Sequence, residues 1–383
     1  MKPKVLVVAA EASSALYMKR LLEYWKRHGK EVDAFGVGSK DMEELGFDCL
    51  GYSHEMAVVG LQEVISHYSL IKNVFKKLIV EAANRLPNVA LLLDFPGFNL
   101  RLAAKLKKLG IPIVYYISPQ IWAWHQNRVK KIRAVVNKML VVFPFEKDFY
   151  DKHGMDCSLV GHPLLDELDD RLFDPSILAR ERRKFGITEN DMLLALMPGS
   201  RHSEVNHHLK VQLKTAEILK KQNTHLKVAL LVAPTLDKKK IQEHMPSINF
   251  PLIMIQKDPM DMVKLADLAL VASGTATLVA GLLEKPMVIM YKMNALTAYI
   301  ARKVVHNVPH FGIINLVLGS KVCPEFFQEN AVPPKLSEAL KGLIHSPEQR
   351  EAMREKLQLA KTKLGDKGAT RRVAEQLEPY IGT

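Results

Sequence analysis

Short runs of apolar residues alternate with longer amphipathic segments through the first part of the chain. The apolar runs have the length of strands and lie at 5–9, 32–37, 89–93, 113–117, 139–143 and 158–160. The segments between them repeat apolar residues at helical spacing, most clearly at 16–27, 64–85 and 100–109. Strands that alternate with helices in this way are typical of βαβ units and a parallel sheet.

The same alternation returns after residues 166–184, a charge-rich stretch where we place the connection between two domains. Strands are expected at 193–197, 227–232, 253–255, 268–271 and 287–290, and helices at 203–221, 260–266 and 275–283. The prediction is an α/β protein with two Rossmann-like, doubly wound domains facing a cleft, at 1–165 and 166–350. The pattern from Pro334 onward is helical, and we expect the helices of 351–383 to pack back on the first domain.

Two strands of the first domain run into loops that carry polar and aromatic side chains. Asp94 and Asn99 follow the strand 89–93. The loop after 113–117 carries Ser118, Gln120, Trp122 and Trp124. Ligands bind at the carboxyl ends of the strands in an open parallel sheet, so these side chains are candidates for chemistry. The alternatives are that Asp94 only caps a turn and that the tryptophans only pack beneath their loop.

Two loops of the second domain have the pattern of phosphate sites, in which a strand, a glycine turn and a helix N-terminus follow one another. The first is Pro198-Gly199-Ser200-Arg201, and the second is Ser273-Gly274-Thr275-Ala276-Thr277. Free N–H groups and the helix dipole favour an anion at such a point, and Arg201 can add a charged contact. Serine or threonine capping needs no ligand, but two such loops in one sheet favour a diphosphate. Glu204 has the alternative role of an acid that complements the helix dipole.

The composition, with 48% hydrophobic and 25% charged residues, is that of a soluble globular protein. No apolar run reaches the ~18–20 residues of a membrane-spanning helix, and the first residues read as a strand rather than a signal peptide. Three widely spaced cysteines predict a reduced, cytoplasmic protein without disulfides or zinc.

The net charge of +13 is unevenly distributed. Residues 95–145 contain no Asp or Glu but carry Arg101, Lys105, Lys107, Lys108, Arg128, Lys130, Lys131, Arg133 and Lys138. Such a stretch favours nucleic acid, phospholipid headgroups or phosphorylated substrates, with a solvated basic face as the alternative.

Several classes of site are missing from the sequence. The first strand leads into Ala10-Glu11-Ala12-Ser13-Ser14-Ala15 rather than a G-x-G-x-x-G turn, which argues against a dinucleotide enzyme. There is also no P-loop and no cluster with the spacing of metal ligands. We interpret His207-His208 as solvated helix surface, and we expect neither a cofactor nor a metal.

Taken together, the motifs resemble those of the lipid-A-disaccharide synthase family. They are DFPGFN (94–99), SPQIWAW (118–124), PFE (144–146), GHPL (161–164), PGSR with Glu204, SGTAT (273–277), and Asn315 followed by PEFFQE (324–329). The resemblance runs from about residue 5 to residue 375. It implies an inverting, metal-independent glycosyltransferase of the two-Rossmann-domain GT-B type.

The resemblance also implies the substrates and the residue roles. UDP-2,3-diacylglucosamine would be the donor, the 6-hydroxyl of 2,3-diacylglucosamine 1-phosphate the acceptor, and UDP and a β-1,6-linked lipid A precursor the products. The second domain, with Asn315, would hold the UDP-sugar. Asp94 would be the base that deprotonates the acceptor hydroxyl. Glu11, Ser13, Asn99 and the loop of Ser118 would serve the acceptor, with Asn99 either orienting Asp94 or binding sugar hydroxyls.

Acylated substrates sit in a bilayer, so the resemblance implies a peripheral enzyme at the cytoplasmic face of the bacterial inner membrane. Residues 56–86 form an apolar stripe edged by Lys72, Lys76 and Lys77, which suits an interfacial helix. Ordinary core packing explains most of the same residues. No nucleic-acid partner is expected, and the sequence leaves open whether the protein is a homo-oligomer.

The chain departs from the family pattern in two places. In the first loop, Ala10, Ser14 and Ala15 replace the family's glycines and aspartate, and further on Val279 replaces the acid that usually follows SGTAxL. These departures keep two alternatives open: another UDP-sugar transferase or epimerase of this fold, or a degenerate protein that binds UDP or glycolipid without turnover.

Overall fold

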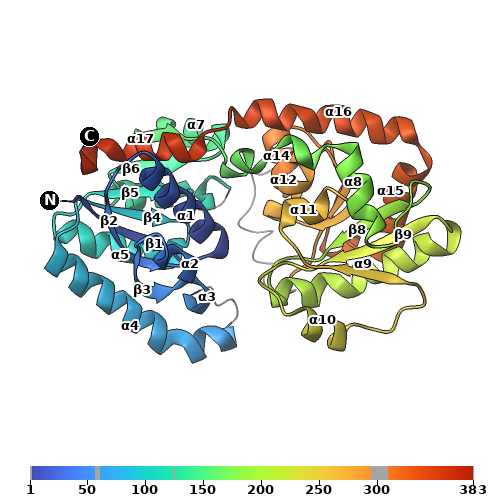
Figure 1. Cartoon of the computed structure of the whole chain (residues 1–383), viewed down its shortest axis with the longest axis horizontal. Coiled ribbons are helices and arrows are strands. Elements are labelled where there is room, and N and C mark those ends of the chain that lie inside the picture. The colour runs from blue at the N-terminus through green and yellow to red at the C-terminus, as the bar shows by residue number, and fades with distance from the viewer. Residues whose placement is uncertain (1, 57–60, 124–125, 295–308, 383) are drawn as a thin grey trace. The chain divides into compact units, whose positions relative to one another are not determined.

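The computed structural model describes residues 2–56, 61–123, 126–294 and 309–382 (Figure 1). The chain forms two compact units: Met1–Asp166 with Leu364–Thr383, and Glu167–Lys363. The second unit therefore extends past the residue 350 that the sequence pattern suggested, because it takes in nearly all of helix α16 (Pro347–Leu364).

The first unit is built on a seven-stranded parallel sheet with the order β3-β2-β1-β4-β5-β6-β7. Its strands are β1 (Lys4–Ala9), β2 (Asp33–Gly38), β3 (Asp48–Tyr52), β4 (Val89–Leu93), β5 (Ile113–Tyr116), β6 (Lys138–Val141) and β7 (Cys157–Leu159). Its α-helices are α1 (Ala12–Arg27), α2 (Lys40–Glu43), α3 (Ser53–Met56), α4 (Leu61–Arg85), α5 (Pro96–Lys108), α6 (Val129–Arg133), α7 (Pro144–Lys152) and α17 (Ala369–Ile381). Short 3₁₀ helices are η1 (Gln120–Trp122), η2 (Gln126–Arg128) and η3 (Pro163–Glu167).

Alternation along the strands divides the core of this unit into two layers. Leu6 and Val8 of β1 pack in one cluster with side chains of α4, α5, α6 and α7. Val5 and Val7 pack in a second cluster with α1 and α17. Because successive strand residues point to opposite faces, a strand of continuous apolar residues is the expected solution for a sheet covered on both sides.

Helix α17 belongs to the first unit although it is the last helix of the chain. The Asp166 carboxylate accepts hydrogen bonds from the N–H groups of Gly368, Ala369 and Thr370, at 2.5, 3.3 and 3.2 Å, and so caps the helix. The apolar face of α17 then packs beside α1.

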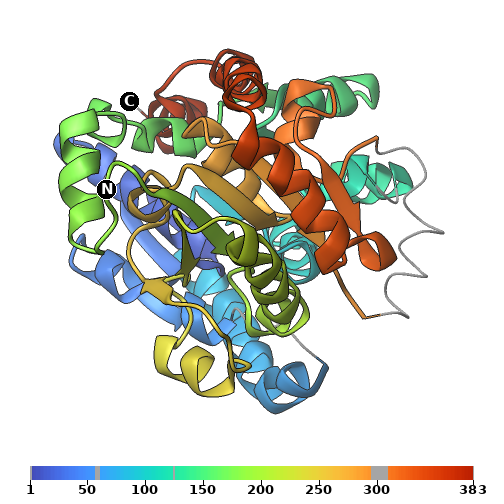
Figure 2. The same cartoon turned by 90° about the vertical axis from the view of Figure 1, so that its right-hand side faces the viewer.

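The second unit has a six-stranded parallel sheet with the order β10-β9-β8-β11-β12-β13. Its strands are β8 (Met192–Met197), β9 (Leu226–Leu231), β10 (Leu252–Ile255), β11 (Leu268–Ala272), β12 (Met287–Tyr291) and β13 (Glu325–Phe327). Its remaining helices are η4 (Asp170–Leu172), α8 (Pro175–Arg183), α9 (His202–Gln222), α10 (Lys238–His244), α11 (Pro259–Val263), α12 (Thr275–Leu282), α14 (Ile313–Leu318), η5 (Gln328–Asn330) and α15 (Pro333–His345). Helix α9 packs beside α15, α12 packs beside α11 and α14, and helices flank the sheet on both sides (Figure 2).

Two parallel α/β units confirm the predicted fold class. The sequence pattern missed the edge strands β3 and β13. β3 contains a glycine and has an exposed first residue, and β13 has three residues, all only partly buried, so neither reads as an apolar run.

The apolar side of α4 packs largely on the core. Val74 and Leu78 are buried, and Leu70, Ile71, Phe75 and Ile79 pack against the same cluster. Core packing, the alternative to membrane contact, therefore accounts for these positions; the side chains of 57–68 lie outside those described.

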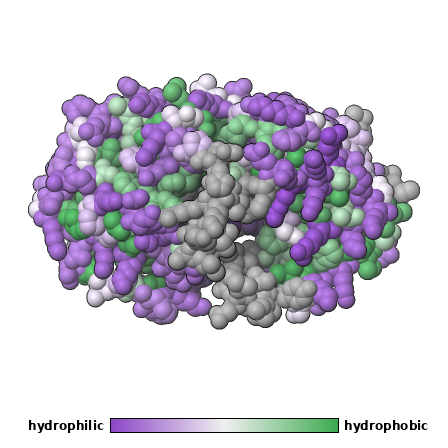
Figure 3. Space-filling view, turned by 180° about the vertical axis from the view of Figure 1, so that it is seen from behind, coloured by the Kyte–Doolittle hydropathy of each residue, from purple (hydrophilic) through white to green (hydrophobic). Residues whose placement is uncertain are grey.

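Within the described ranges, no helix has the length and apolarity needed to cross a membrane. On the face that Figure 3 shows, hydrophilic residues predominate and hydrophobic residues lie in patches between them.

Candidate active site

The loop that carries Asp94 has an unusual backbone. Asp94 and Phe95, between β4 and α5, have φ of 46° and 47°, and Ile117, after the neighbouring strand β5, has φ of 65°. Non-glycine residues in this left-handed region cost on the order of 1–3 kcal/mol each and cluster at functional sites. The carboxyl ends of β4 and β5 are therefore held in a conformation that the surrounding structure must enforce.

Buried polar side chains hold the Asp94 backbone in this conformation. The Asp94 carbonyl accepts hydrogen bonds from the Tyr115 hydroxyl and from Asn99 Nδ2, the latter at 2.7 Å. The Asp94 N–H donates to the Tyr116 carbonyl at 3.0 Å. Burial, followed by the charge of Asp94, raises the pKa of Tyr115 well above its usual value, so Tyr115 stays protonated and able to donate. Asn99 Nδ2 also donates to the Leu93 carbonyl at 3.0 Å, so this amide is bonded to the backbone that carries Asp94.

A buried carboxylate supports the loop that follows β5 and carries Ser118. The Ser118 hydroxyl donates to Glu146 Oε1 at 2.7 Å, and Glu146 Oε2 accepts from the N–H groups of Val142 and Phe143 at 3.2 and 3.1 Å. Glu146 is 2% exposed, and burial raises its pKa to about 7 even though its hydrogen bonds favour the charged form. Glu146 is the last residue of the PFE motif, and its role as a buried support was not predicted from the sequence.

The other predicted acceptor residues differ in their surroundings. The Trp122 ring packs edge-on against Phe145, with centroids 4.8 Å apart, which favours packing beneath the loop. Gln120 and Ser13 are exposed, and Glu11 is the N-cap of α1. Trp124 lies outside the described residues.

The first loop forms without the family's glycines. Helix α1 begins directly at Ala12, and both Ser14 and Ala15 are buried in its first turn. Ser14 and Ala15, two of the positions where the sequence departs from the family pattern, thus lie in a regular helix.

Glu204 organises the Pro198–Arg201 loop, the first of the two loops predicted to bind phosphate. Its Oε2 accepts the Ser200 N–H at 2.9 Å, and its Oε1 lies 3.9 Å from Arg201 Nη1. Gly199 has φ of 127°, and a Cβ there would stand 2.4 Å from Glu204 Oε2. This turn therefore requires glycine. Arg201 is the N-cap of α9, and its side chain is 44% exposed.

Two hydroxyls of the Ser273–Thr277 loop already donate hydrogen bonds within the protein. Ser273 donates to the Phe311 carbonyl at 2.7 Å, and Thr277 donates to the Gly274 carbonyl at 2.8 Å. Thr275 is exposed, and Ala276 is partly buried beside it in the first turn of α12. The loop therefore offers an anion mainly backbone N–H groups.

The N-termini of α9 and α12 differ from those of α8, α10 and α11. Asp174, Asp237 and Asp258 cap α8, α10 and α11 with side-chain hydrogen bonds. The N-cap residues of α9 and α12, Arg201 and Gly274, make no such bond with their side chains, and neither does Val332 of α15. The first N–H groups and positive dipole ends of α9 and α12 can therefore serve an anion.

The Asn315 side chain, in α14, makes hydrogen bonds with residues 322–325. Its Nδ2 donates to the Cys323 carbonyl and to Glu325 Oε1, at 2.8 and 2.9 Å, and its Oδ1 accepts the N–H groups of Val322 and Cys323, at 3.0 and 2.9 Å. The amide thus holds the turn before β13, and these bonds give the predicted contact with the nucleotide sugar no support.

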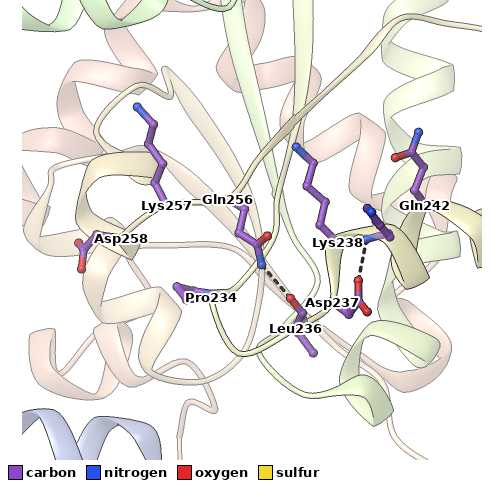
Figure 4. A pocket seen from close by; sticks show the side chains of 9 residues that line it. Pro234, Leu236, Asp237, Lys238, Gln242, Gln256, Lys257 and Asp258 are labelled. Carbon is purple, nitrogen blue, oxygen red and sulfur yellow. Dashed lines mark hydrogen bonds between the residues drawn. The ribbon is translucent and has the colours of Figure 1, made fainter. Parts of the chain in front are cut away.

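A pocket of about 980 Å³, which the sequence pattern did not predict, lies at the carboxyl ends of β9 and β10 (Figure 4). It is lined by Pro234, Leu236, Asp237, Lys238, Lys239, Gln242, Gln256, Lys257 and Asp258. Gln256 Nε2 bridges the Ala233 and Leu236 carbonyls at 3.1 and 2.8 Å. Thr235 donates to the Ser200 carbonyl at 2.9 Å, which joins the pocket rim to the first phosphate loop.

The structure corrects our interpretation of His208. We expected it on a solvated helix surface, but it is fully buried on the face of α9 that carries Val205 and Gln212. His207, its neighbour, is exposed as expected. Over the described part of the chain, no group of three or more His, Cys, Asp or Glu side chains could hold a metal ion.

Comparison with known proteins identifies relatives along the whole chain. A sequence model of the family described as lipid-A-disaccharide synthetase matches residues 5–379. The lipid-A-disaccharide synthase of Anaeromyxobacter sp. (strain K) is 37% identical over 375 residues, covering 98% of this chain and 96% of the relative. That of Syntrophus aciditrophicus (strain SB) is 38% identical over 371 residues, covering 97% and 96%.

Solved structures share the fold at low identity. A putative UDP-N-acetylglucosamine 2-epimerase from Listeria monocytogenes matches with a TM-score of 0.68 at 10% identity, covering 100% of this chain and 97% of the other. UDP-GlcNAc 2-epimerase from Neisseria meningitidis, bound to UDP-GlcNAc, matches with a TM-score of 0.64 at 16% identity, covering 98% and 100%. These similarities establish the architecture only.

Proposed function

Because this chain belongs to the lipid-A-disaccharide synthase family, we propose that it joins UDP-2,3-diacylglucosamine to the 6-hydroxyl of 2,3-diacylglucosamine 1-phosphate. The family match over residues 5–379 carries this conclusion, because it includes all four strand-end loops described above. The chain is a glycosyltransferase of lipid A biosynthesis. The proposed products are UDP and a β-1,6-linked disaccharide, formed without a cofactor.

Asp94 is the proposed general base of the first unit. Its carboxylate takes the proton of the acceptor 6-hydroxyl while that oxygen bonds to the anomeric carbon of the donor. The bond from that carbon to the diphosphate breaks, and its electron pair leaves with UDP. The transition state resembles an oxocarbenium ion, as in glycoside chemistry generally. Tyr115 and Asn99 support this role because they fix the backbone from which the carboxylate extends.

The second unit is the proposed UDP-sugar site. The N-termini of α9 and α12, together with Arg201, stabilise the negative charge that develops on the leaving diphosphate. The nucleoside is assigned to the pocket beside Thr235, since Thr235 joins that pocket to the phosphate loop. Lys238 and Lys257 line the pocket and add positive charge.

The first unit is the proposed acceptor and membrane-facing unit. Exposed cations of α5 and α6 would contact anionic headgroups at the cytoplasmic face of the inner membrane; they are Arg101, Lys105, Lys107, Lys108, Lys130, Lys131 and Arg133. The full-length protein should sediment with phosphatidylglycerol vesicles at low salt and remain in solution with phosphatidylcholine vesicles. Equal binding to both vesicles would contradict a headgroup contact.

The test of the reaction is a transfer assay with purified protein in detergent and EDTA. UDP release and disaccharide formation are measured with the unmutated protein, with Asp94→Asn, and with Asp148→Asn. Asp148 is an exposed carboxylate of the same unit, so its substitution controls for the charge change. We expect product that Asp94→Asn abolishes and Asp148→Asn preserves.

Other outcomes separate the alternatives. Turnover of UDP-N-acetylglucosamine without acyl chains would indicate a different UDP-sugar enzyme. UDP binding without any transfer would indicate a protein that only binds its ligand. Activity that survives Asp94→Asn would keep the reaction but remove Asp94 as its base.

A further inference from the structure

Two polar side chains of α9, His208 and Gln212, are fully buried on the face that meets the sheet. They are four residues apart, so they lie one above the other on the helix. Burying an amide and an imidazole is costly unless each finds hydrogen-bond partners. Their partners are therefore informative: Met197, Pro198 and Lys292 lie at or just past the carboxyl ends of strands, and Leu270 lies in the middle of β11.

Gln212 joins two neighbouring strands. Its Nε2 donates to the Met197 carbonyl at the end of β8 and to the Leu270 carbonyl in β11, each at 3.2 Å. Met197 directly precedes the Pro198–Arg201 loop, and β11 leads into the Ser273–Thr277 loop. One amide group thus ties together the two strands that present the proposed phosphate loops.

His208 joins the first of these loops to a third strand. Its Nδ1 lies 2.8 Å from the Pro198 carbonyl, and its Nε2 lies 2.9 Å from the backbone nitrogen and 3.0 Å from the carbonyl oxygen of Lys292, the residue after β12. Burial lowers the pKa of His208, which favours the neutral ring. A neutral ring protonated at Nδ1 donates to the Pro198 carbonyl and accepts from the Lys292 N–H.

We propose that His208 and Gln212 are positioning residues that set the spacing of the two phosphate loops and thereby the affinity for the UDP diphosphate. The inference rests on the proposed UDP site. A diphosphate must meet donors from both loops at once, and functional groups lose effectiveness when displaced by roughly 0.5 Å. Both side chains are buried, so they act through the loops.

Thr215 provides a matched control on the same helix face. It is also fully buried, but its hydroxyl donates to the Val211 carbonyl within α9, at 2.8 Å, and it makes no recorded contact with either loop. Thr215→Val removes a buried hydrogen bond while keeping the shape of the side chain. It therefore reports what a purely structural loss in α9 does.

The experiment uses the full-length chain and four variants: Gln212→Met, His208→Leu, His208→Asn and Thr215→Val. Calorimetry gives the Kd for UDP and the Tm of each, and the transfer assay gives KM and kcat for the acylated donor. We expect Gln212→Met and His208→Leu to raise Kd and KM about tenfold, the equivalent of one or two lost hydrogen bonds. The kcat should change much less.

The remaining variants distinguish positioning from stability. His208→Asn keeps a donor near the position of Nδ1 and should recover part of the UDP affinity. Thr215→Val should lower Tm and leave Kd within about twofold of the unmutated protein. If His208→Leu does not fold, His208→Asn against Thr215→Val makes the same comparison, with an expected loss of about threefold in affinity.

Two results would overturn the inference. One is an unchanged Kd in Gln212→Met and His208→Asn despite a lower Tm, and the other is an equal loss of affinity in Thr215→Val. If the unmutated protein does not bind UDP at all, the proposed UDP site itself fails. That outcome differs from one in which UDP binds and the variants bind it equally well.

Discussion

The Tyr115 hydroxyl donates a hydrogen bond to the backbone carbonyl of Asp94. Tyr115 lies in β5 and Asp94 follows β4, so a side chain of one strand fixes the loop that leaves its neighbour. Asp94 has a left-handed backbone conformation, which needs such an external partner. The position of the proposed base thus depends on a buried phenol of the adjacent strand.

Tyr115→Phe should therefore impair the reaction more than substrate binding. Without the Tyr115 hydroxyl, the Asp94 carbonyl keeps its hydrogen bond from Asn99. We expect the free energy of unfolding to fall by about 1–2 kcal/mol and kcat to fall about tenfold, with KM for the donor unchanged. Kinetics of the transfer reaction and denaturant unfolding measure both effects.

The control for this prediction is Tyr116→Phe. Tyr116 is the next residue of β5 and is also buried, but it packs in the opposite layer with α1 and α17. Its substitution should affect stability alone. Equal losses of kcat in both variants would show that the Asp94 contact has no special role.

Glu146→Gln should remove a pH dependence of stability. Burial raises the pKa of Glu146 from 4.5 to about 7, so the folded protein binds this proton more tightly than the unfolded chain. The contribution is complete below pH 4.5 and is lost as pH rises to about 7, on the order of 3 kcal/mol in all. The free energy of unfolding of the unmutated protein, relative to that of Glu146→Gln, should fall across this range.

The comparison must be a difference between the two proteins, because other groups titrate as well. Burial lowers the pKa of His162 to about 3, and this shift makes stability rise with pH between about 3 and 6.5. His162 is present in both proteins and cancels. Urea titrations at several pH values supply the measurement, and parallel curves would show that Glu146 does not take up a proton in this range.

Gly199→Ala should disable the first phosphate loop. The new Cβ would stand 2.4 Å from Glu204 Oε2, and φ of 127° is unfavourable for any side chain. The loop must move, so we expect KM for the donor to rise at least about tenfold and stability to fall by about 1–3 kcal/mol. Gly186→Ala is the control, because Gly186 has φ of 68° in the same unit and no atoms within 4 Å of its Cβ position. A normal KM in Gly199→Ala would argue against a phosphate role for this turn.

The sequence predicted most of the fold because the inner strands are apolar on both faces and end at marked turns. It also led to Asp94 and to the two phosphate loops, because strand ends are recognisable from the pattern. It named orientation of Asp94 as one possible role of Asn99, but it did not predict that the Glu204 carboxylate accepts the Ser200 N–H, since a side chain's partner depends on tertiary contacts.

Buried polar groups were the main omission, and their partners explain why. The partners of Glu146 include Ser118, 28 residues away in the chain, and Gln212 bonds to Leu270, 58 residues away. No periodicity records such a pairing. The sequence did contain one signal of a buried polar group: His208 is a polar residue at an apolar position of α9.

Arg201→Gln should weaken the binding of UDP but not of uridine. The Arg201 side chain is 44% exposed at the N-cap of α9, where it adds positive charge to the helix N-terminus. If the diphosphate sits there, losing this charge should raise the Kd for UDP about ten- to a hundredfold, as expected for charge-assisted hydrogen bonds. Uridine has no phosphate, so its Kd should not change.

Since exposed charges are screened, UDP affinity should also fall less steeply with salt in Arg201→Gln than in the unmutated protein. Arg180→Gln, at an exposed arginine of α8 in the same unit, should leave UDP affinity unchanged. Calorimetric titrations with UDP and uridine at two salt concentrations decide the matter: equal weakening of both ligands would place the effect of Arg201 on the nucleoside pocket instead of on the phosphates.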